Sequence, residues 1–322
     1  MIRLHESQVN KDTVRRLTEL TILGHIEKAG LTDEFEHQVL EATGLKKADG
    51  CFCIATADNV YPYMLALSSL GVSSGDQIIA PSLLPSNAVL ESAKHFQATI
   101  RWENIDRKRL TIDPDKIAAA ISPKTKCIIA MDHDSNICDH KAIAEIGSQF
   151  NLPVIHDASR AFGARCHHDP VDQHHALTAI SCTPADTLNC VEGGALIGRD
   201  LSVLRKIEEQ RGIRLPNPRK TKQAPILIDQ ESVGLSYRMS PFHAGIGIDS
   251  IKQMDANYRL KADNTLRLEG ILRDNTSHSW HQVGDRKSPN LFCIAAKNRQ
   301  VAQELRKTIK EHGIECEKPW RS

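Results

Sequence analysis

The stretch SCTPADTLNCVEGG, residues 181–194, places one acid, Asp186, in a proline-marked loop that leads into a Glu-Gly-Gly turn. A carboxylate in such a loop can act as a general base or pair with a cation, but it cannot form an imine. Two other polar residues end apolar runs: Asp157 closes PVIHD, and Ser181 closes ALTAIS. Asp157, Ser181 and Asp186 are therefore the first candidates for a functional site.

Short apolar runs alternate with segments of helical period between residues 50 and 200. This alternation is typical of crossover units and predicts an α/β domain with a large, mostly parallel seven-stranded sheet and helices on both faces. Ligands bind such a sheet outside the carboxyl ends of its strands, so the three candidates are predicted to face one cleft. The predicted strands are residues 51–57, 77–82, 98–102, 127–132, 153–158, 176–181 and 194–198.

Capping signals indicate where some helices begin. Asp113 before Pro114 predicts an N-cap followed by proline at the first helical position. Thr32 or Asp33 is expected to cap a helix with an apolar face. A further helix is expected over residues 201–211.

The second half of the chain predicts a separate, smaller unit. Residues 213–232 are rich in proline and basic residues and indicate an exposed arm. Residues 241–272 predict one long helix, and residues 289–313 predict a strand followed by a helix. We therefore expect a large domain over residues 1–240, including N-terminal helices, and a smaller C-terminal α+β domain over residues 241–322.

Composition excludes several functional classes. Of the 322 residues, 40% are hydrophobic and 25% charged, with a formal net charge of +1, which gives no electrostatic reason to expect nucleic acid or an anionic membrane as partner. No apolar stretch approaches the ~18 residues that span a bilayer. The N-terminus, MIRLHESQVN, has no apolar run after a basic start, so we expect a cytoplasmic protein. The nine cysteines are an odd, scattered set that does not predict a disulfide framework.

One stretch is rich in metal-ligating side chains. Imidazole and thiolate are good zinc ligands, but adjacent histidines in one loop seldom point at a single centre. We therefore expect no specific metal site there, only adventitious nickel or zinc binding. The residues concerned are Cys166, His167, His168, Asp169, His174 and His175.

Five ordered segments resemble the DegT/DnrJ/EryC1/StrS family of sugar aminotransferases. They are SLGVSSGDQIIAPS, IDPDKIAAAISPKTKCIIAMD, LPVIHDASRAFGA, the EGGAL turn and SYRMSPFHAGIG. The resemblance covers roughly the whole chain and implies the fold type I architecture. It also implies chemistry based on pyridoxal phosphate (PLP).

That chemistry needs a lysine that forms an imine with the cofactor aldehyde, and an acid opposite the pyridine nitrogen. Asp157 matches the acid, and Ser181 also stands as the family has it. The lysine position is occupied by Asp186. We therefore expect no covalently bound cofactor, and we expect PLP or pyridoxamine phosphate (PMP) at most as a noncovalent ligand.

Other cofactor contacts that the resemblance implies are also replaced. Asn59 and Val60 stand where a Gly-Thr pair donates to the phosphate, so a hydroxyl is lost and side chains occupy a place of close backbone approach. The remaining departures are Leu83, Leu84 and Pro85 for a stacking aromatic, Arg160 for a glutamine, and Ser236 for an asparagine from the neighbouring subunit.

Alternatives stay open for three residues. Asp157 can face a ligand or cap the segment that follows its strand. Asp186 can be the base of a dehydratase or a vestige in an inactive site. Arg160 can neutralise Asp157 and fill the cleft, or it can clamp a carboxylate or a sugar-nucleotide phosphate.

These observations favour a pseudoenzyme of amino-sugar, polysaccharide or antibiotic biosynthesis that acts as a binding or partner subunit. The alternative is an active enzyme on a nucleotide-linked sugar, either a dehydratase that uses Asp186 or a cofactor-independent catalyst. We expect a homodimer, or a heterodimer with an intact paralogue, because the family builds each cleft from two subunits.

Overall fold

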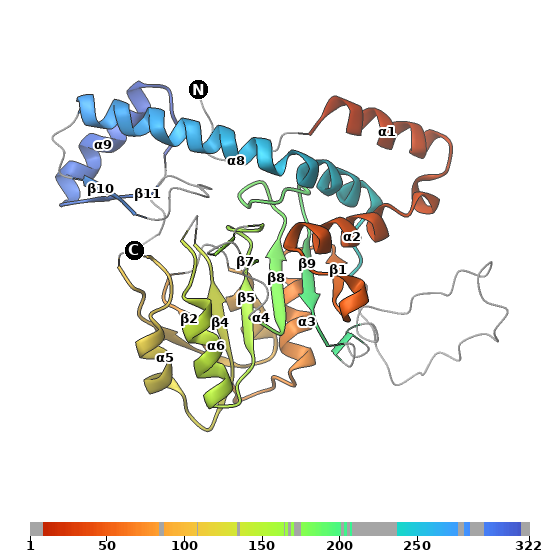
Figure 1. The fold of residues 1–322 in the computed structure, drawn as a ribbon, viewed down its shortest axis with the longest axis horizontal. Coiled ribbons are helices and arrows are strands. Elements are labelled where there is room, and N and C mark those ends of the chain that lie inside the picture. Colours follow the sequence, from red (N-terminus) through yellow and green to blue (C-terminus); the bar gives the residue numbers. More distant parts are fainter. Residues whose placement is uncertain are drawn as a thin grey trace.

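A seven-stranded sheet forms the centre of the structure, a computed structural model (Figure 1). Its strands lie in the order β1-β9-β8-β5-β4-β2-β3. They are β1 (Phe52–Thr56), β2 (Gln77–Pro81), β3 (Thr99–Glu103), β4 (Thr125–Met131), β5 (Val154–Asp157), β8 (Leu177–Ser181) and β9 (Gly194–Gly198).

The structure describes residues 9–83, 87–107, 109–133, 136–163, 165–166, 169–170, 175–200, 203–204, 207, 237–275, 280–283 and 293–316. The predicted arm over residues 213–232 and most of the helix expected over residues 201–211 lie outside these ranges.

The sheet is mostly parallel, as predicted. β3, β2, β4, β5 and β8 pair with their neighbours in parallel, whereas β9 is antiparallel to both β8 and β1. All seven predicted strands are present. Six of them are largely buried apolar runs because helices cover both faces of most of the sheet, whereas β3 at the end of the strand order is mostly exposed.

Side chains that alternate along each strand enter two different cores. In β4, Ile129 packs with α3 (Tyr61–Ser69) and α4 (Ala88–His95), while its neighbours Ile128 and Ala130 pack with α5 (Pro114–Ala120) and α6 (His140–Gln149). Further along that second face, α2 (Leu31–Thr43) covers β1. The molecule is therefore a three-layer α/β fold, with helices on both faces of the sheet.

The capping predictions have two outcomes. Asp113 caps α5 as predicted, because its side chain accepts the Asp115 N–H, and Pro114 is the first helical residue. The expectation for α2 was wrong: Gly30, at a φ of 66°, is its N-cap, and no side chain caps this end. Thr32 and Asp33 lie inside the first turn, where the charge of Asp33 still favours the helix dipole.

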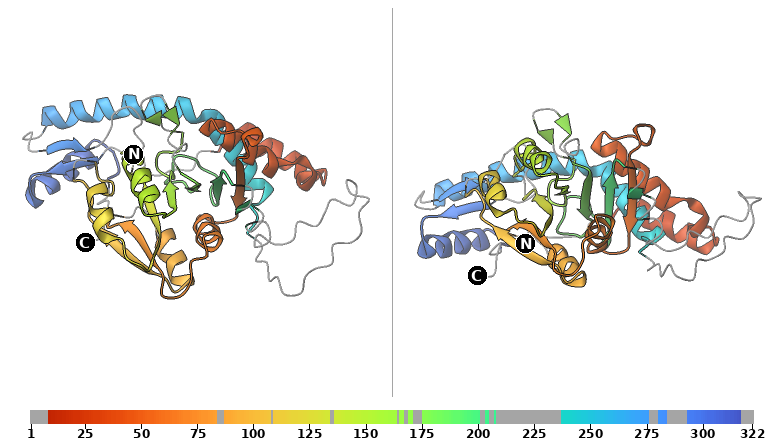
Figure 2. Two further views of the ribbon diagram at one scale, coloured as in Figure 1. Left: turned by 60° about the horizontal axis from the view of Figure 1, so that its bottom comes forward. Right: turned by 90° about the horizontal axis from the view of Figure 1, so that it is seen from below.

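One long helix joins two parts of the structure. In Figures 1 and 2, α8 (Pro241–Asn275) runs along one side of the molecule, and α9 (Arg299–Glu311) lies near one of its ends with β10 (Trp280–Val283) and β11 (Cys293–Ala296). Ile248 near the start of α8 packs with α2, whereas Leu272 near its end packs with α9. The predicted boundary between residues 240 and 241 stays a prediction.

The remaining described elements are α1 (Lys11–Ile22), the 3-10 turns η1 (Ile26–Ala29) and η2 (Lys47–Asp49), and the short strands β6 (Arg165–Cys166) and β7 (Asp169–Pro170). None of the helices in the described ranges has the length and apolar character needed to cross a bilayer. The cysteines whose side chains are described are free thiols, and most of them are buried in the core.

Candidate active site at the carboxyl ends of the parallel strands

Polar residues end two neighbouring parallel strands at one edge of the sheet. Asp157 is the last residue of β5, and Ser181 is the last residue of β8. Because β5 and β8 are parallel, their carboxyl ends meet at the same edge. The predicted proximity of these positions follows from this pairing.

Asp157 is buried, with 2% of its surface exposed, and its carboxylate is held by the protein itself. Oδ1 accepts hydrogen bonds from the Ser159 N–H at 2.9 Å and the Ser159 hydroxyl at 2.5 Å. Oδ2 accepts a hydrogen bond from the buried hydroxyl of Tyr63 on α3. Burial raises the pKa of Asp157, and the bonds from Ser159 and Tyr63 offset part of that rise.

Four contacts from three residues hold the carboxylate of Asp186 in its loop. Its Oδ2 accepts the Ser181 hydroxyl at 2.5 Å, the Thr183 hydroxyl at 2.6 Å and the Thr183 N–H at 2.9 Å. Its Oδ1 lies 3.4 Å from Nε of Arg160, and only 6% of the Asp186 side chain is exposed. The sequence suggested Asp157 as the partner of Arg160, whereas the ion pair found here joins Arg160 to Asp186.

Ser159 connects the two acids. Its hydroxyl donates to Asp157 and accepts the Ser181 N–H at 2.8 Å, while the Ser181 hydroxyl donates to Asp186. Asp157, Ser159, Ser181 and Asp186 thus form one continuous chain of hydrogen bonds. The structure brings the three predicted residues together through a serine that the sequence did not single out.

The Glu-Gly-Gly turn closes this loop against the sheet. Gly193 has a φ of 120°, and a Cβ there would lie 2.7 Å from Met239 Cε and 2.9 Å from the Thr56 oxygen. At Gly194 a Cβ would lie 2.7 Å from both the Ile180 oxygen and Pro62 Cγ. Glycine is therefore required on steric grounds at both positions.

Asn59 and Val60 lie at the start of α3. Val60 is the residue before the helix, and its side chain packs against the core between α3 and the sheet. Its N–H donates to Oδ1 of Asp58 at 2.8 Å. The carboxylate of Asp58 therefore accepts a backbone N–H at the start of α3, a position where the N–H groups of a helix can bind an anion.

Several predicted positions fall outside the described residues. These are Ser236, Leu84, Pro85 and, in the His/Cys-rich stretch, His167, His168 and His174. Among the described residues, the ring of Tyr237 lies 4.4 Å from that of Tyr61, so Tyr237 lies next to the start of α3 in the same chain.

Tyr63, Ser159 and Thr183 complete the site and were missed in the sequence. A signal for two of them was present. Ser159 stands two residues after Asp157, and Thr183 stands three residues before Asp186, which are spacings at which acids accept local backbone bonds. Tyr63 gave no such signal, because it is 94 residues from the acid that it contacts.

The strand order and the three-layer α/β architecture are those of the fold type I aminotransferases. The aminotransferase TlmJ from Streptoalloteichus hindustanus superposes with a TM-score of 0.81 at 17% identity, covering 97% of this chain and 83% of that one. NtdA from Bacillus subtilis, solved with bound PMP, gives a TM-score of 0.73 at 20% identity over 92% of this chain and 66% of its own.

The chain belongs to the DegT/DnrJ/EryC1/StrS aminotransferase family, whose sequence profile matches residues 7–320. A relative is the L-glutamine:2-deoxy-scyllo-inosose aminotransferase of Streptomyces lividus, 28% identical over 228 residues. That match covers 69% of this chain and 53% of the relative, so the chain spans about half the length of this enzyme.

The described residues do not fit PLP as this family uses it. The acid at the end of β5 has its oxygens engaged by Ser159 and Tyr63, and an N–H at the start of α3 is engaged by Asp58. A phosphate at that helix end would face the charge of Asp58 and would find no hydroxyl on Val60. The described part of the loop after β8, residues 182–193, contains no lysine that could supply an amine, and its acid Asp186 is ion-paired with Arg160.

Proposed function

We propose that this chain is a family member without PLP-lysine transamination, and that it serves as a ligand-binding or partner subunit in amino-sugar or secondary-metabolite biosynthesis. One observation carries the proposal. Asp186, in the position that the resemblance gives to the lysine, is bonded by Ser181 and Thr183 and ion-paired with Arg160. A carboxylate held in this way supplies neither an amine nor an accessible nucleophile.

The same contacts argue against the alternative of a dehydratase with Asp186 as base. A general base must reach the substrate proton within hydrogen-bond distance. Oδ2 of Asp186 already accepts three hydrogen bonds, and Oδ1 faces Arg160. Proton abstraction would require several of these bonds to break first. Arg160 and Asp186 instead compensate each other's charge.

The partner in this proposal is a second copy of the chain or an intact paralogue. Apolar side chains are exposed along α1 and α8 and support an interface there. They are Val14 (50% exposed), Ile22 (79%), Phe242 (42%), Leu260 (58%) and Leu266 (60%). Light scattering at micromolar concentration is expected to give the mass of a dimer. A monomer mass, without complex formation on addition of a paralogue, would contradict this part of the proposal.

Cofactor titration tests the central claim. The purified protein is expected to be colourless, and PLP is expected to change its melting temperature little. A ligand at a hundredfold excess over its Kd would add about 2.7 kcal/mol of stability. A rise of several degrees at sub-millimolar PLP would therefore argue for an intact pocket and for Asp186 as a base.

Restoring the lysine sharpens this test. Asp186→Lys supplies the amine but leaves Asp58, Asn59 and Val60 at the helix start, so borohydride is expected to trap no stoichiometric cofactor. The comparison variant adds Asn59→Gly and Val60→Thr, and its absorbance and trapped cofactor are measured beside those of the single variant. If Asp186→Lys alone traps PLP stoichiometrically at micromolar concentration, the pocket is intact and the proposal is wrong.

A further inference from the structure

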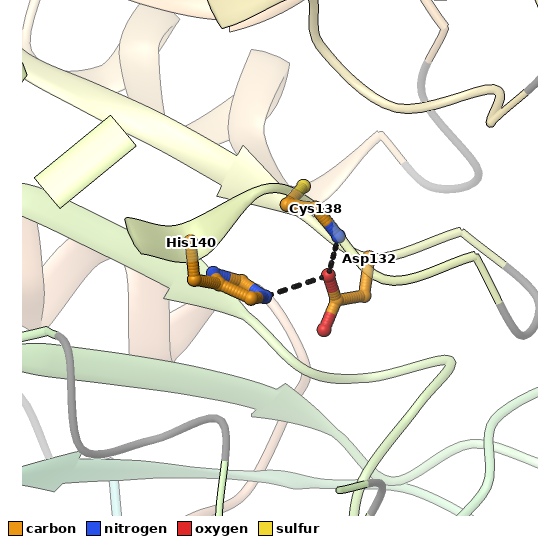
Figure 3. A group of neighbouring side chains, drawn as sticks. All are labelled: Asp132, Cys138 and His140. Carbon is orange, nitrogen blue, oxygen red and sulfur yellow. Dashed lines mark hydrogen bonds and ion pairs between the residues drawn. The ribbon is translucent and has the colours of Figure 1, made fainter. Parts of the chain in front are cut away.

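A buried group of metal-ligating side chains lies beside the site described above. Figure 3 shows the imidazole of His140, at the start of α6, directed at the carboxylate of Asp132, directly after β4. The backbone N–H of Cys138 donates to Oδ1 of Asp132 at 2.8 Å, and the Cys138 thiol donates to the Met131 oxygen at 3.1 Å. One carboxylate oxygen, the thiol sulfur and one imidazole nitrogen all lie within 4.8 Å of one another. The three residues are only 1%, 3% and 4% exposed.

Two further histidines, His156 and His175, form hydrogen bonds with Asp132 and His140. Oδ1 of Asp132 lies 2.9 Å from Nε2 of His140, while Oδ2 lies 2.9 Å from Nε2 of His156 on β5. Nδ1 of His140 lies 2.7 Å from Nε2 of His175. Metal-binding histidines and carboxylates are commonly held by such bonds to their remaining atoms.

Charge favours a cation at this place. The ion pairs of Asp132 with described residues are both to imidazoles. With neutral imidazoles the group carries one buried negative charge, which is costly unless a ring takes a proton or a metal ion binds. A soft sulfur, a nitrogen and an oxygen together suit Zn²⁺, which binds all three.

The spacing is close to what zinc needs. Tetrahedral zinc with bonds of about 2.0–2.3 Å places its ligand atoms about 3.3–3.8 Å apart. The 2.9 Å between Oδ1 of Asp132 and Nε2 of His140 is slightly shorter. This pair therefore has to separate by a few tenths of an ångström, and the Cys138 thiol has to exchange its bond to the Met131 oxygen for the ion.

We propose that Asp132, Cys138 and His140 bind one Zn²⁺ ion. His156 orients Asp132 through its Oδ2, and His175 orients His140 through its Nδ1. The ion replaces the proton of the Cys138 thiol, which is released to solvent, and water completes its tetrahedral coordination. Such a site fixes the connection between β4 and α6. It also adjoins the candidate active site, because the Asp132 N–H donates to the backbone oxygen of Asp157 at 3.0 Å.

The test is the zinc content of the full chain, purified without a histidine tag and equilibrated with zinc before gel filtration. About one zinc per chain is expected in the native protein. Cys138→Ser and His140→Gln are expected to lose it. His175→Gln, which changes only an orienting partner, is expected to weaken zinc binding about 10–100-fold in chelator competition.

Two controls separate this site from adventitious binding. The triple variant His167→Gln, His168→Gln, His174→Gln and the surface variant His37→Gln are expected to keep one zinc per chain. X-ray absorption at the zinc edge of the native protein is expected to report one sulfur at about 2.3 Å with nitrogen or oxygen ligands, independently of how any variant folds. A protein without zinc, a zinc shell without sulfur, or full zinc content in Cys138→Ser would overturn the proposal.

Discussion

Asp132 directly follows β4 and Asp157 is the last residue of the neighbouring strand β5, and both are buried, yet the pKa values of their carboxyl groups shift in opposite directions. Burial alone raises the pKa of each. Around Asp132 the imidazoles of His140 and His156 outweigh burial and hold the pKa of the carboxyl well below its usual range. Around Asp157 the neutral groups of Ser159 and Tyr63 offset burial only in part, so its pKa stays raised.

This contrast shows that the partners of a strand-end acid, and not its depth, decide what the acid can do. The carboxyl group of Asp132 stays ionised, and it lies beside imidazole nitrogens and a thiol sulfur that can bind a metal ion. The polar groups around Asp157 and Asp186 form their hydrogen bonds with one another, through Ser159, Ser181 and Thr183. The first arrangement suits a cation, and the second leaves little capacity for a ligand.

The largest expected effect comes from Asp132→Asn. The change removes the charged acceptor that contacts Nε2 of His140 and Nε2 of His156, and hydrogen bonds to a charged group contribute about 1.5–3 kcal/mol each, so a loss of about 3–5 kcal/mol is expected. Urea denaturation of the zinc-free protein measures the loss. Glu311→Gln, at an exposed pair with Lys307, is the control and is expected to stay within about 0.5 kcal/mol of the native protein. If Asp132→Asn lowers the free energy of unfolding as little as this control does, the proposed difference between Asp132 and Asp157 is wrong.

Asp186→Ala is expected to cost less, about 2 kcal/mol, because it removes an acceptor for Ser181 and Thr183 and leaves Arg160 without its counter-ion. Equilibrium denaturation measures the change. Thr183→Val, which removes only one hydroxyl donor, serves as the matched control and is expected to cost about 1 kcal/mol. If Asp186→Ala proves as stable as the native protein, the loop does not depend on this network, and Asp186 is available for another role.

The smallest effect at neutral pH is expected for Asp157→Asn, at about 1 kcal/mol, since the amide keeps one acceptor for Ser159. Its pH dependence is the sharper test. Because the folded-state pKa of Asp157 is raised, its stabilising contribution is fully present below the unfolded pKa of about 4 and is lost as pH rises through the folded value. The cost of the substitution is therefore expected to fall as the pH rises above about 4. A cost that grows with pH would show that hydrogen bonds to Asp157 outweigh its burial.

The short runs of the sequence were sufficient to predict all seven strands and their mostly parallel sheet. Six of the strands are largely buried and leave nearly continuous apolar segments, whereas the exposed strand β3 was predicted from a run, ATIRW, that includes an arginine. The same pattern located Asp157 and Ser181 at strand ends, and it placed Asp186 in the loop after β8. The cap at Asp113 was also readable, since the acid and Pro114 are adjacent. The cap of α2 was not, because Gly30 acts through its backbone conformation and leaves no side-chain signal.

The tertiary structure decided which side chains contact each acid at this edge of the sheet. Tyr63 reaches Asp157 across 94 residues, Arg160 pairs with Asp186, and the histidines around Asp132 come from three separate segments. No local pattern encodes these contacts, because they depend on which strands become neighbours and which helix faces them. The sequence by itself determined the sheet and the types of residue at its edge. Packing determined whether each acid at that edge meets a hydroxyl, a guanidinium or an imidazole, and therefore what it can bind.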